Sequence, residues 1–340
     1  MRVVTLKRYP TGMISPEDFE IIEKEIPEIA NGQALIENIY CSTDPYLRGR
    51  MLPPRFNTGS GRFASIEPGE VIQNETIGRV VSSNISGLSE GDYVLHMGGW
   101  AEFSTIEEDS FYRSFEVDNT QDIDTQLQRY LVINGLVGRT AYHSLTHGSN
   151  LQPGEVACVS GADGGVGHIY IQQARLLGAS KVYGITSSQE KANQIEDLGA
   201  TPVIIPRGSK LQDVLSIYQN EIKEEINSYH ENVGNDYFLA AMNCMHNTGR
   251  MVYCGAMSLY NNTMPSPGPT LIPLIYKDIT IRGCFLSDFD LESYTKMLHT
   301  HKDQIKALTT IYHGLDSLPQ QFTDHFVFTD TRLGKSLCKL

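Results

Sequence analysis

The stretch that most constrains the fold of this chain runs from Val156 to Gly167 and reads V-A-C-V-S-G-A-D-G-G-V-G. Its first five residues, Val156 to Ser160, are small or β-branched, which is typical of a buried strand. Four glycines follow within seven positions, and His168 to Leu177 then have a helical pattern. A strand, a glycine turn and a helix in this order predict a dinucleotide site, where a pyrophosphate binds the free N–H groups that begin the helix.

The match to the dinucleotide fingerprint is imperfect. Ala162, Gly164 and Gly167 fit G-x-G-x-x-G only with alanine at the first position. A glycine turn that merely closes a strand–helix unit is therefore the alternative at this point. The residues that follow the next expected strand, Lys181 to Thr186, favour the nucleotide site.

The end of that second strand indicates which dinucleotide binds. An NAD-specific site places Asp or Glu there, about 20 residues beyond the glycines, to bind the ribose 2′-OH. This chain has Thr186, Ser187 and Ser188 instead, followed by Lys191 in the first turn of the next helix. Hydroxyls and an ammonium group suit a 2′-phosphate, so NADPH is the predicted cofactor. The alternative for Lys191 is a solvated lysine on a helix surface.

Length and charge limit the classes of function. The chain has 340 residues, more than one hydrophobic core usually organises, so two domains are expected. A net charge of −13 argues against a nucleic-acid partner. No apolar run reaches the length of a membrane span and the N-terminus has no signal-peptide core, so we expect no membrane partner and a cytoplasmic location. The six scattered cysteines fit reduced thiols rather than a disulfide framework.

The pattern of short and long apolar runs predicts two kinds of β structure. In the first 120 residues, short runs broken by Gly, Pro and Asp are typical of a small β-barrel or sandwich. After Pro153, strands and helices alternate, which predicts a parallel, doubly wound sheet. The strands expected in this second part are 156–160, 181–186, 202–205, 237–242, 250–255 and 279–285. The charged run 222–226 is interpreted as a solvated helix face, and Phe326 to Leu340 as β structure that returns to the first domain.

Several motifs together resemble one enzyme family. They are Ser42-Thr-Asp-Pro-Tyr-Leu-Arg48, Gly99-Trp100, Gly135 to Tyr142, the glycine turn, Gln189-Glu-Lys191, Gly249 to Asn261 and Ile275-Tyr-Lys277. With these motifs the chain resembles a zinc-independent medium-chain dehydrogenase/reductase of the leukotriene B4 12-hydroxydehydrogenase/prostaglandin reductase branch, which includes alkenal double-bond reductases and curcumin reductase. The block Cys254 to Asn261 is the most specific part of the resemblance.

The resemblance implies both a fold and an activity. The fold is α/β, with a GroES-like β-barrel domain (1–122, completed by 295–340) split around a Rossmann NADP(H)-binding domain (123–294). The activity is NADPH-dependent reduction of the carbon–carbon double bond of α,β-unsaturated aldehydes or ketones, with hydride transfer to the β-carbon. A small-molecule carbonyl substrate and a homodimer are implied as well.

The same resemblance implies a set of site residues. Tyr260 is expected beside the nicotinamide as the donor that stabilises charge on the substrate carbonyl, and Tyr46 is the second candidate, as a wall of the pocket. Arg48 is expected to tie its loop or to form a structural ion pair. The expected cofactor-binding residues are Asp163, Gly164, Gly165, Val166, Gly167, Thr186, Ser187, Lys191, Arg207, Cys254, Gly255, Ala256, Tyr260 and Phe285.

No metal is expected at this site. Cys41-Ser-Thr-Asp44 resembles the first ligand segment of zinc alcohol dehydrogenases, but a catalytic zinc needs three converging protein ligands. The neighbourhood where such enzymes carry Gly-His-Glu reads Gln73-Asn-Glu75, without an imidazole. His299 and His301 are two residues apart and would point to different sides of a helix.

Three departures from the family pattern leave alternatives open. The Asp-Asn-Val-Gly expected after the fourth strand is replaced by Ala240-Ala-Met-Asn243-Cys244, and Arg332 replaces an asparagine. Pro206 replaces a tyrosine beside the adenosine ribose-phosphate, where Arg207 and Lys210 could serve instead. These departures motivate a non-catalytic NADPH-binding protein as one alternative. A quinone reductase, which shares the glycine pattern, is the other.

The last three residues suggest a second hypothesis on location. Cys338-Lys339-Leu340 is a relaxed form of the Ser-Lys-Leu peroxisomal address. A receptor needs such a tail to be free, whereas the chain of this family usually ends in a strand. Cytoplasm therefore remains the first expectation and the peroxisome the alternative.

Overall fold

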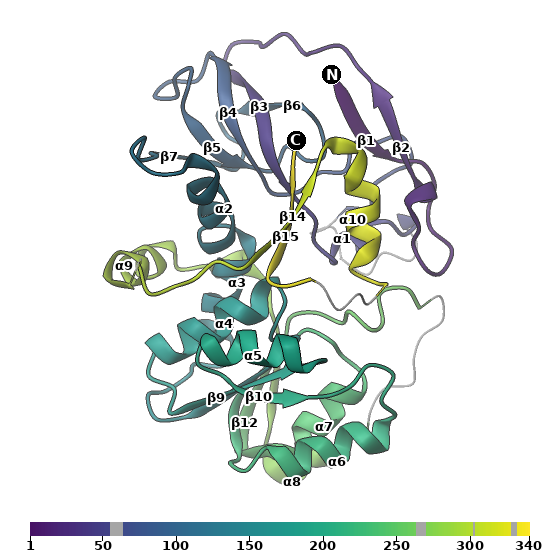
Figure 1. The fold of residues 1–340 in the computed structure, drawn as a ribbon, viewed down its shortest axis with the longest axis vertical. Helices are drawn as coiled ribbons and strands as arrows, with labels where there is room; N and C mark the ends of the chain where they lie inside the picture. The colour runs from purple at the N-terminus through teal and green to yellow at the C-terminus, as the bar shows by residue number, and fades with distance from the viewer. Residues whose placement is uncertain (55–63, 263–269, 302, 328–331) are drawn as a thin grey trace.

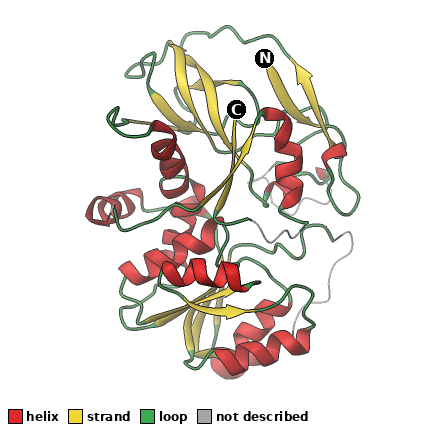
Figure 2. Ribbon diagram, viewed as in Figure 1, coloured by secondary structure: helices red, strands yellow, loops and turns green. Residues whose placement is uncertain are grey.

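Two sheets from different parts of the chain form the two halves of the molecule (Figure 1). The computed structural model describes residues 1–54, 64–262, 270–301, 303–327 and 332–340. The lower half in Figure 1 holds the alternating strands and helices of residues 156–283, and the upper half holds the N-terminal strands together with the last strands of the chain. Figure 2 shows helices on both sides of the lower sheet.

The lower half is a parallel sheet with the strand order β10-β9-β8-β11-β12-β13. Its strands are β8 (Val156–Ser160), β9 (Lys181–Thr186), β10 (Thr201–Ile204), β11 (Ile226–Glu231), β12 (Met245–Tyr253) and β13 (Thr280–Gly283), and the helices along it are α4 (Gly165–Leu176), α5 (Gln189–Asp197), α6 (Leu211–Glu221), α7 (Asp236–Cys244) and α8 (Ile272–Lys277). The chain moves outward from β8 to β10 and then crosses back to β11, beside β8. The predicted doubly wound sheet is confirmed, and its topological switch point lies between β8 and β11.

The upper half is a mostly antiparallel sheet, ordered β14-β15-β3-β4-β5-β7, with β6 also paired to β3 and a separate β1-β2 hairpin. Its strands are β1 (Arg2–Leu6), β2 (Phe19–Glu23), β3 (Gln33–Ser42), β4 (Thr76–Ser83), β5 (Tyr93–His96), β6 (Phe103–Glu107), β7 (Tyr112–Phe115), β14 (Thr309–His313) and β15 (Lys335–Lys339), and the remaining helices are α1 (Leu47–Arg50), α2 (Ile123–Ile133), α3 (Leu136–His143), α9 (Leu291–His301) and α10 (Leu318–Asp324). The end of the chain therefore returns to the sheet of its beginning. The domain boundaries at residues 122 and 294 stay predictions.

Apolar clusters hold each half together. One packs Ile169 of α4 against Val159 of β8, and another packs Tyr218 of α6 and Met242 of α7 on the other face of the sheet. In the upper half, Trp100 is completely buried and contacts the ring of Phe322 from α10 at a centroid distance of 5.6 Å. The N- and C-terminal parts of the chain thus share one core.

The strand expected at 237–242 is wrong: these residues belong to helix α7. The apolar run Tyr237 to Met242 is short enough to fit either structure, because only an amphipathic period separates the two. In the structure, Phe238, Ala241 and Met242 are buried, the three- and four-residue spacing of one helix face. The charged run 222–226 is also not a helix, since α6 ends at Glu221 and Ile226 begins β11.

The fourth strand of the chain's parallel sheet is instead β11, whose sequence I-N-S-Y-H-E looks polar although most of it is buried. Its polar side chains have partners inside the protein. Ser228 donates to the hydroxyl of Ser149 at 2.7 Å, and His230 contacts the hydroxyl of Ser144 at 2.6 Å. A buried polar group costs little once it is hydrogen-bonded, so this strand is stable at the centre of the sheet.

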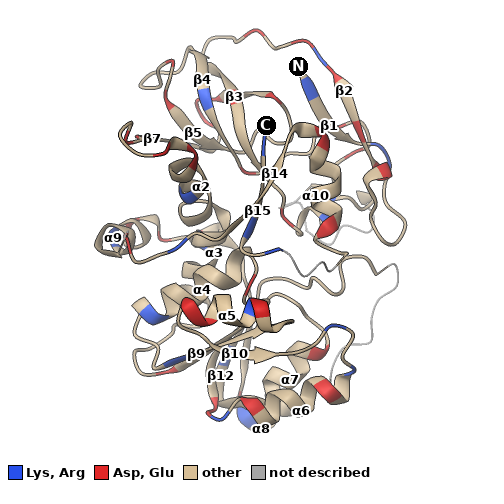
Figure 3. Cartoon of the chain, viewed as in Figure 1, with Lys and Arg blue, Asp and Glu red and all other residues tan. Residues whose placement is uncertain are grey.

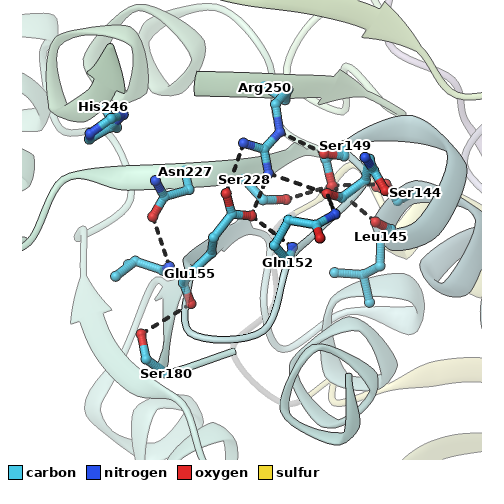
Figure 4. Close-up of polar contacts among 12 residues, drawn as sticks. Ser144, Leu145, Ser149, Gln152, Glu155, Ser180, Asn227, Ser228, His246 and Arg250 are labelled. Carbon is cyan, nitrogen blue, oxygen red and sulfur yellow. Dashed lines mark hydrogen bonds and ion pairs between the residues drawn. The ribbon is translucent and has the colours of Figure 1, made fainter. Parts of the chain in front are cut away.

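The same polar network extends to the amino end of the neighbouring strands (Figure 4). Arg250 of β12 donates from Nε to the carbonyl of Ser149 at 2.6 Å and forms an ion pair with Glu155, just before β8. Asn227 accepts a hydrogen bond from the N–H of Val156 at 2.9 Å. These contacts fix the register of β8, β11 and β12 at the end of the sheet opposite the glycine turn.

The C-terminal tail is part of the upper sheet. β15 pairs with β3 through Leu337 opposite Ser42 and Cys338 opposite Cys41, and the N–H of Leu340 donates to the carbonyl of Ile39 at 3.0 Å. The tail is therefore not free for a receptor in this structure, and the location of the protein stays a prediction. Over the ranges described above, no helix has the length and apolar character of a membrane span. Figure 3 shows acidic and basic residues interspersed over both halves.

Candidate active site

A cavity of about 470 Å³ lies between the two halves. One side is formed by the carboxyl ends of β8, β9, β11, β12 and β13, and the other by segments 43–46 and 332–336. Ligands of doubly wound sheets bind at the carboxyl ends of the strands, beside the switch point. The cavity therefore occupies the place where a dinucleotide is expected.

The glycine turn forms the floor of this cavity. Gly164 is the N-cap of α4, and Gly161 has a φ of +59°, which favours glycine. At Gly167 a Cβ would lie 2.3 Å from the carbonyl oxygen of Gly161, so any side chain there would force the turn apart. The turn exposes the first N–H groups of α4 to the cavity, which suits a pyrophosphate.

The C-terminal segment docks directly onto this turn. The N–H of Gly334 donates to the carbonyl of Asp163 at 2.7 Å, and Gly334 forms an isolated parallel bridge with Gly164. A Cβ on Gly334 would lie 1.9 Å from the carbonyl oxygen of Leu308, and its φ is +66°. Glycine is therefore required at position 334, on the C-terminal side of the contact that joins the two halves.

A cluster of charges lies where the adenosine 2′-phosphate is expected. Lys191 is almost fully buried and pairs with the carboxylate of Asp163 at 2.8 Å, so it is not a solvated surface lysine. Asp163 also accepts a hydrogen bond from the hydroxyl of Thr186 at 2.8 Å. The guanidinium of Arg207 donates to Ser187 at 3.3 Å. These five residues line the cavity, whereas Ser188 is the N-cap of α5 and Lys210 the N-cap of α6.

The two tyrosines that the sequence singled out, Tyr46 and Tyr260, line the cavity and differ in their hydrogen bonds. Tyr46 donates to the side-chain oxygen of Asn74 at 2.9 Å. In the part of the chain that the structure describes, no acceptor is found for the hydroxyl of Tyr260. Burial raises the pKa of Tyr260 to about 12, although the backbone of Ala256 lowers it through a hydrogen bond. Tyr260 is thus a neutral phenol with its proton available to a ligand.

The loop that carries Tyr260 is held by Arg48. Its Nε donates to the side-chain oxygen of Asn261 at 2.9 Å, and a terminal nitrogen donates to the carbonyl of Gly12 at 3.0 Å. Arg48 therefore ties its loop to the neighbour of Tyr260 by hydrogen bonds, and among the described residues no ion pair of Arg48 is found.

Behind Tyr46 lies a buried ion pair between Asp44 and Lys335. Ser42 donates to the same carboxylate at 2.5 Å, and Asn74 donates to it at 2.9 Å. Burial alone would raise the pKa of Asp44, but the ammonium group of Lys335 and these hydrogen bonds lower it. The charged carboxylate fixes Asn74, and Asn74 in turn fixes the hydroxyl of Tyr46.

Arg332 lies beside this network and holds His325. Its guanidinium donates to Nδ1 of His325 at 2.9 Å, and Nε2 of the same ring lies 3.0 Å from the carbonyl of Thr43. Burial and the charge of Arg332 lower the pKa of His325 to about 3, so the ring is neutral. The departure at position 332 therefore replaces an amide with a cation in the cavity wall.

The Asp-Asn-Val-Gly motif, expected to be missing after the fourth strand of the parallel sheet, is present in a closely similar form. Because β11 is the fourth strand, the residues that follow it are Asn232, Val233 and Gly234, and Glu231 ends the strand itself. The buried carboxylate of Glu231 accepts the N–H groups of Val233 at 2.6 Å and Gly234 at 2.8 Å. The sequence thus reads Glu-Asn-Val-Gly for Asp-Asn-Val-Gly. The expected departure at Asn243 and Cys244 is wrong, since both lie in α7, outside the cavity wall.

The cavity wall includes both tyrosines and every cofactor-binding residue expected from the sequence except Ala256. Those residues are Asp163, Gly164, Gly165, Val166, Gly167, Thr186, Ser187, Lys191, Arg207, Cys254, Gly255, Tyr260 and Phe285. Sequence reasoning missed Asn232, Tyr237, His325 and Lys335, which line the wall as well. The Asn-Val-Gly triplet could have identified Asn232 if β11 had been placed correctly.

The segment that resembles a zinc-ligand motif makes other contacts here. The thiol of Cys41 donates to the carbonyl of Gly99 at 3.3 Å, and burial raises its pKa. Glu75 forms an ion pair with Arg139 at 2.6 Å and accepts the N–H of Leu136. Among the described residues, no three His, Cys, Asp or Glu side chains form a group that could hold a metal ion.

Comparison with known proteins identifies similar chains. Residues 2–113 match the family described as the N-terminal domain of oxidoreductase, and residues 165–302 match the family described as zinc-binding dehydrogenase. The chain is 32% identical to a 2-alkenal reductase (NADP(+)-dependent) of Nicotiana tabacum over 98% of this chain and 96% of that one. It is 29% identical to prostaglandin reductase 1 of Bos taurus, covering 98% of each.

A solved structure is similar along the whole chain. The crystal structure of CurA from Vibrio vulnificus in complex with NADPH has a TM-score of 0.84 and 26% identity, and the match covers 100% of this chain and 99% of that one. Because the match covers the whole chain, it extends over both the lower and the upper half of the molecule.

Lys191 provides a test of the phosphate subsite. We expect Lys191→Ala to weaken NADPH binding by about 10- to 100-fold, because a charge-assisted contact to the 2′-phosphate is lost. NADH binding should change little, since NADH has no phosphate at this position. Calorimetric titration with both cofactors measures the two affinities. Lys210→Ala, outside the cavity wall, is the matched control, and equal affinities of the native protein for NADPH and NADH would contradict the assignment.

Proposed function

The chain belongs to the leukotriene B4 12-hydroxydehydrogenase/prostaglandin reductase branch of the zinc-independent medium-chain dehydrogenases/reductases, and we propose that it reduces the carbon–carbon double bond of α,β-unsaturated aldehydes and ketones. Its cofactor is NADPH. The observation that supports the proposal is that Tyr260 lines the cavity, in the turn that follows β12, with a pKa that burial raises to about 12.

The bound cofactor would supply a hydride for the β-carbon of the substrate. As the hydride arrives, negative charge builds on the carbonyl oxygen, and the hydroxyl of Tyr260 donates a hydrogen bond to it. Such a donor is most effective in a site that excludes water, and the burial that raises the pKa of Tyr260 indicates this environment. A proton from solvent or from a nearby hydroxyl then completes the reduction at the α-carbon. The hydroxyl of Tyr46 is engaged by Asn74, so Tyr46 forms the wall of the pocket.

The cofactor-binding roles follow from the chemistry of the cavity wall. We assign the pyrophosphate to the N–H groups of Gly165 and Val166 at the start of α4. Lys191 and Arg207 would hold the 2′-phosphate, because they are the cations next to the hydroxyls of Thr186 and Ser187. This set of donors fits the anionic groups of NADPH without a metal.

The two alternatives predict different turnover. A non-catalytic NADPH-binding protein would consume no cofactor with any enal. The corrected position of Glu231 to Gly234 removes one of the departures that motivated it. A quinone reductase would oxidise NADPH faster with quinones than with enals and enones. Measuring NADPH oxidation with matched sets of enals, enones and quinones separates the three.

Tyr260→Phe tests the role of the phenol. We expect kcat to fall by about 100- to 1,000-fold, because the hydrogen bond to the developing oxyanion is lost while the ring remains. NADPH affinity should change little. Steady-state kinetics with a simple enal, together with a cofactor titration, measure both effects.

Tyr46→Phe is the matched control and should retain most of the kcat of the parent, since its hydroxyl donates to Asn74. A Tyr260→Phe enzyme with the full kcat of the parent on every enal and enone would contradict the proposal. A loss confined to KM would mean that the hydroxyl only binds the ground state.

We also propose that the protein is a homodimer that forms through the free edge of the parallel sheet. In the described chain, β13 pairs only with β12, and all its residues are exposed. Next to it, helix α8 exposes Ile275 and Tyr276, with 75% and 83% of their surface accessible. An exposed edge strand has unpaired N–H and C=O groups that tend to pair with another strand, and a two-fold axis would bury this edge and the apolar side chains of α8 at once.

The double substitution Ile275→Asp/Tyr276→Asp tests this interface. Two charges on α8 should convert the dimer to a monomer at micromolar concentration, as measured by light scattering after gel filtration. Ile26→Asp is the matched control, because Ile26 is an exposed apolar residue of the N-terminal segment. A parent protein that is monomeric, or a double variant that stays dimeric, would contradict the proposed interface.

A further inference from the structure

Two cysteines stand side by side at the rim of the parallel sheet. Tyr253 of β12 is directly opposite Gly283 of β13, so the next residues, Cys254 and Cys284, are neighbours beyond the ends of the two strands. The N–H of Cys284 donates to the carbonyl of Tyr253 at 3.0 Å, which continues the ladder to this point. Adjacent strands lie about 4.8 Å apart, within the range of about 4.4–6.8 Å that joins the Cα atoms of a disulfide.

The two thiols interact, and their pKa values are shifted in opposite directions. The interaction with Cys254 lowers the pKa of Cys284, burial opposes this shift, and the positive charge of Arg282 lowers the pKa further. The interaction with Cys284 raises the pKa of Cys254 well above its usual value, and burial adds to this. Cys284 is therefore the nucleophile of the pair, because the thiolate is the reactive form.

Both cysteines line the cofactor cavity, and both residues are only partly buried. Three of the other free cysteines, Cys41, Cys158 and Cys338, are buried, and burial raises the pKa of each. The remaining one, Cys244, is partly buried in α7, lies outside the cavity wall and also has a raised pKa. Among the cysteines of the chain, all of which the structure describes, the pair in the cavity is thus the site that a small oxidant would reach first.

We propose that Cys284 and Cys254 form a peroxide-sensitive pair that closes to a disulfide in the cofactor-free protein and thereby lowers its affinity for NADPH. The thiolate of Cys284 attacks one oxygen of hydrogen peroxide, the O–O bond breaks, and the leaving hydroxide takes a proton to become water. The sulfur of Cys254 then attacks the sulfenic acid and releases a second water. Two thiols are oxidised to one disulfide and one peroxide is reduced to two waters.

The position of the pair explains the expected loss of affinity. Cys254 begins the turn that leads to Tyr260, and Cys284 precedes Phe285, so both sulfurs belong to the wall that the cofactor contacts. The backbone is closely packed in this wall, because a Cβ on Gly255 would lie 3.0 Å from the carbonyl oxygen of Asn232. A disulfide between Cys254 and Cys284 would shift the segments that follow β12 and β13, which both belong to this wall. By linkage, bound NADPH must in turn disfavour the disulfide at equilibrium.

The test uses the full-length protein, without NADPH and with saturating NADPH, treated with hydrogen peroxide. Peptide mapping under non-reducing conditions should reveal a linked pair of peptides that contain Cys254 and Cys284. The oxidised protein should bind NADPH at least about tenfold more weakly than the reduced protein, and dithiothreitol should restore the affinity. Saturating NADPH during the treatment should prevent the link.

Two variants make the result specific to the pair. Cys284→Ser should form no link, and peroxide should leave its own NADPH affinity unchanged. Cys244→Ser, the matched control outside the cavity, should behave as the parent does. A parent that forms no Cys254–Cys284 link under excess peroxide, a link that leaves NADPH affinity unchanged, or oxidation of Cys284 to a sulfinic acid with Cys254 still reduced would each overturn the proposal. These outcomes do not depend on which substrate the enzyme reduces.

Discussion

The backbone contact between the glycine turn and the C-terminal segment is the constraint on which the rest of the structure depends. Gly334 donates to Asp163, and the positive φ of Gly334 and its approach to Leu308 leave no room for a side chain. The contact brings the end of the chain over the start of α4, where a pyrophosphate binds. A cavity of about 470 Å³ lies between the halves beside this contact, and Gly164 and Gly334 both line it.

Two ion pairs line this cavity, and they have different structural roles. Lys191 is held by Asp163 near the phosphate subsite, and Lys335 is held by Asp44 behind the pocket wall. Removing one partner of a buried pair leaves an uncompensated charge, which is far more costly than the pair itself. The second pair therefore makes a rigid support for Asn74 and the wall of the pocket, while the first orients a cation toward the cofactor.

Much of the fold could be predicted from the sequence, because alternating strands and helices around a glycine turn leave few topologies. The strands β8 and β9 have the predicted bounds. The failure at β11 has a physical cause: Ser228, His230 and Glu231 are buried with internal partners, so hydropathy marks this strand as polar. The prediction of the site failed at Asn232 for the same reason. The Asn-Val-Gly triplet was expected after residues 237–242, whereas it follows β11. Pairs such as Lys335 with Asp44 join residues far apart in the chain, and no local pattern predicts them.

The central claim is that hydride from NADPH reaches the β-carbon of an α,β-unsaturated carbonyl compound while the Tyr260 hydroxyl faces the carbonyl oxygen. The most direct measurement follows the label in a reduction of a simple enone with NADPH that carries deuterium at the transferred position. The account predicts a saturated ketone with deuterium on the β-carbon, identified by nuclear magnetic resonance. An allylic alcohol with deuterium on the former carbonyl carbon, or a saturated product without deuterium at the β-carbon, would contradict it.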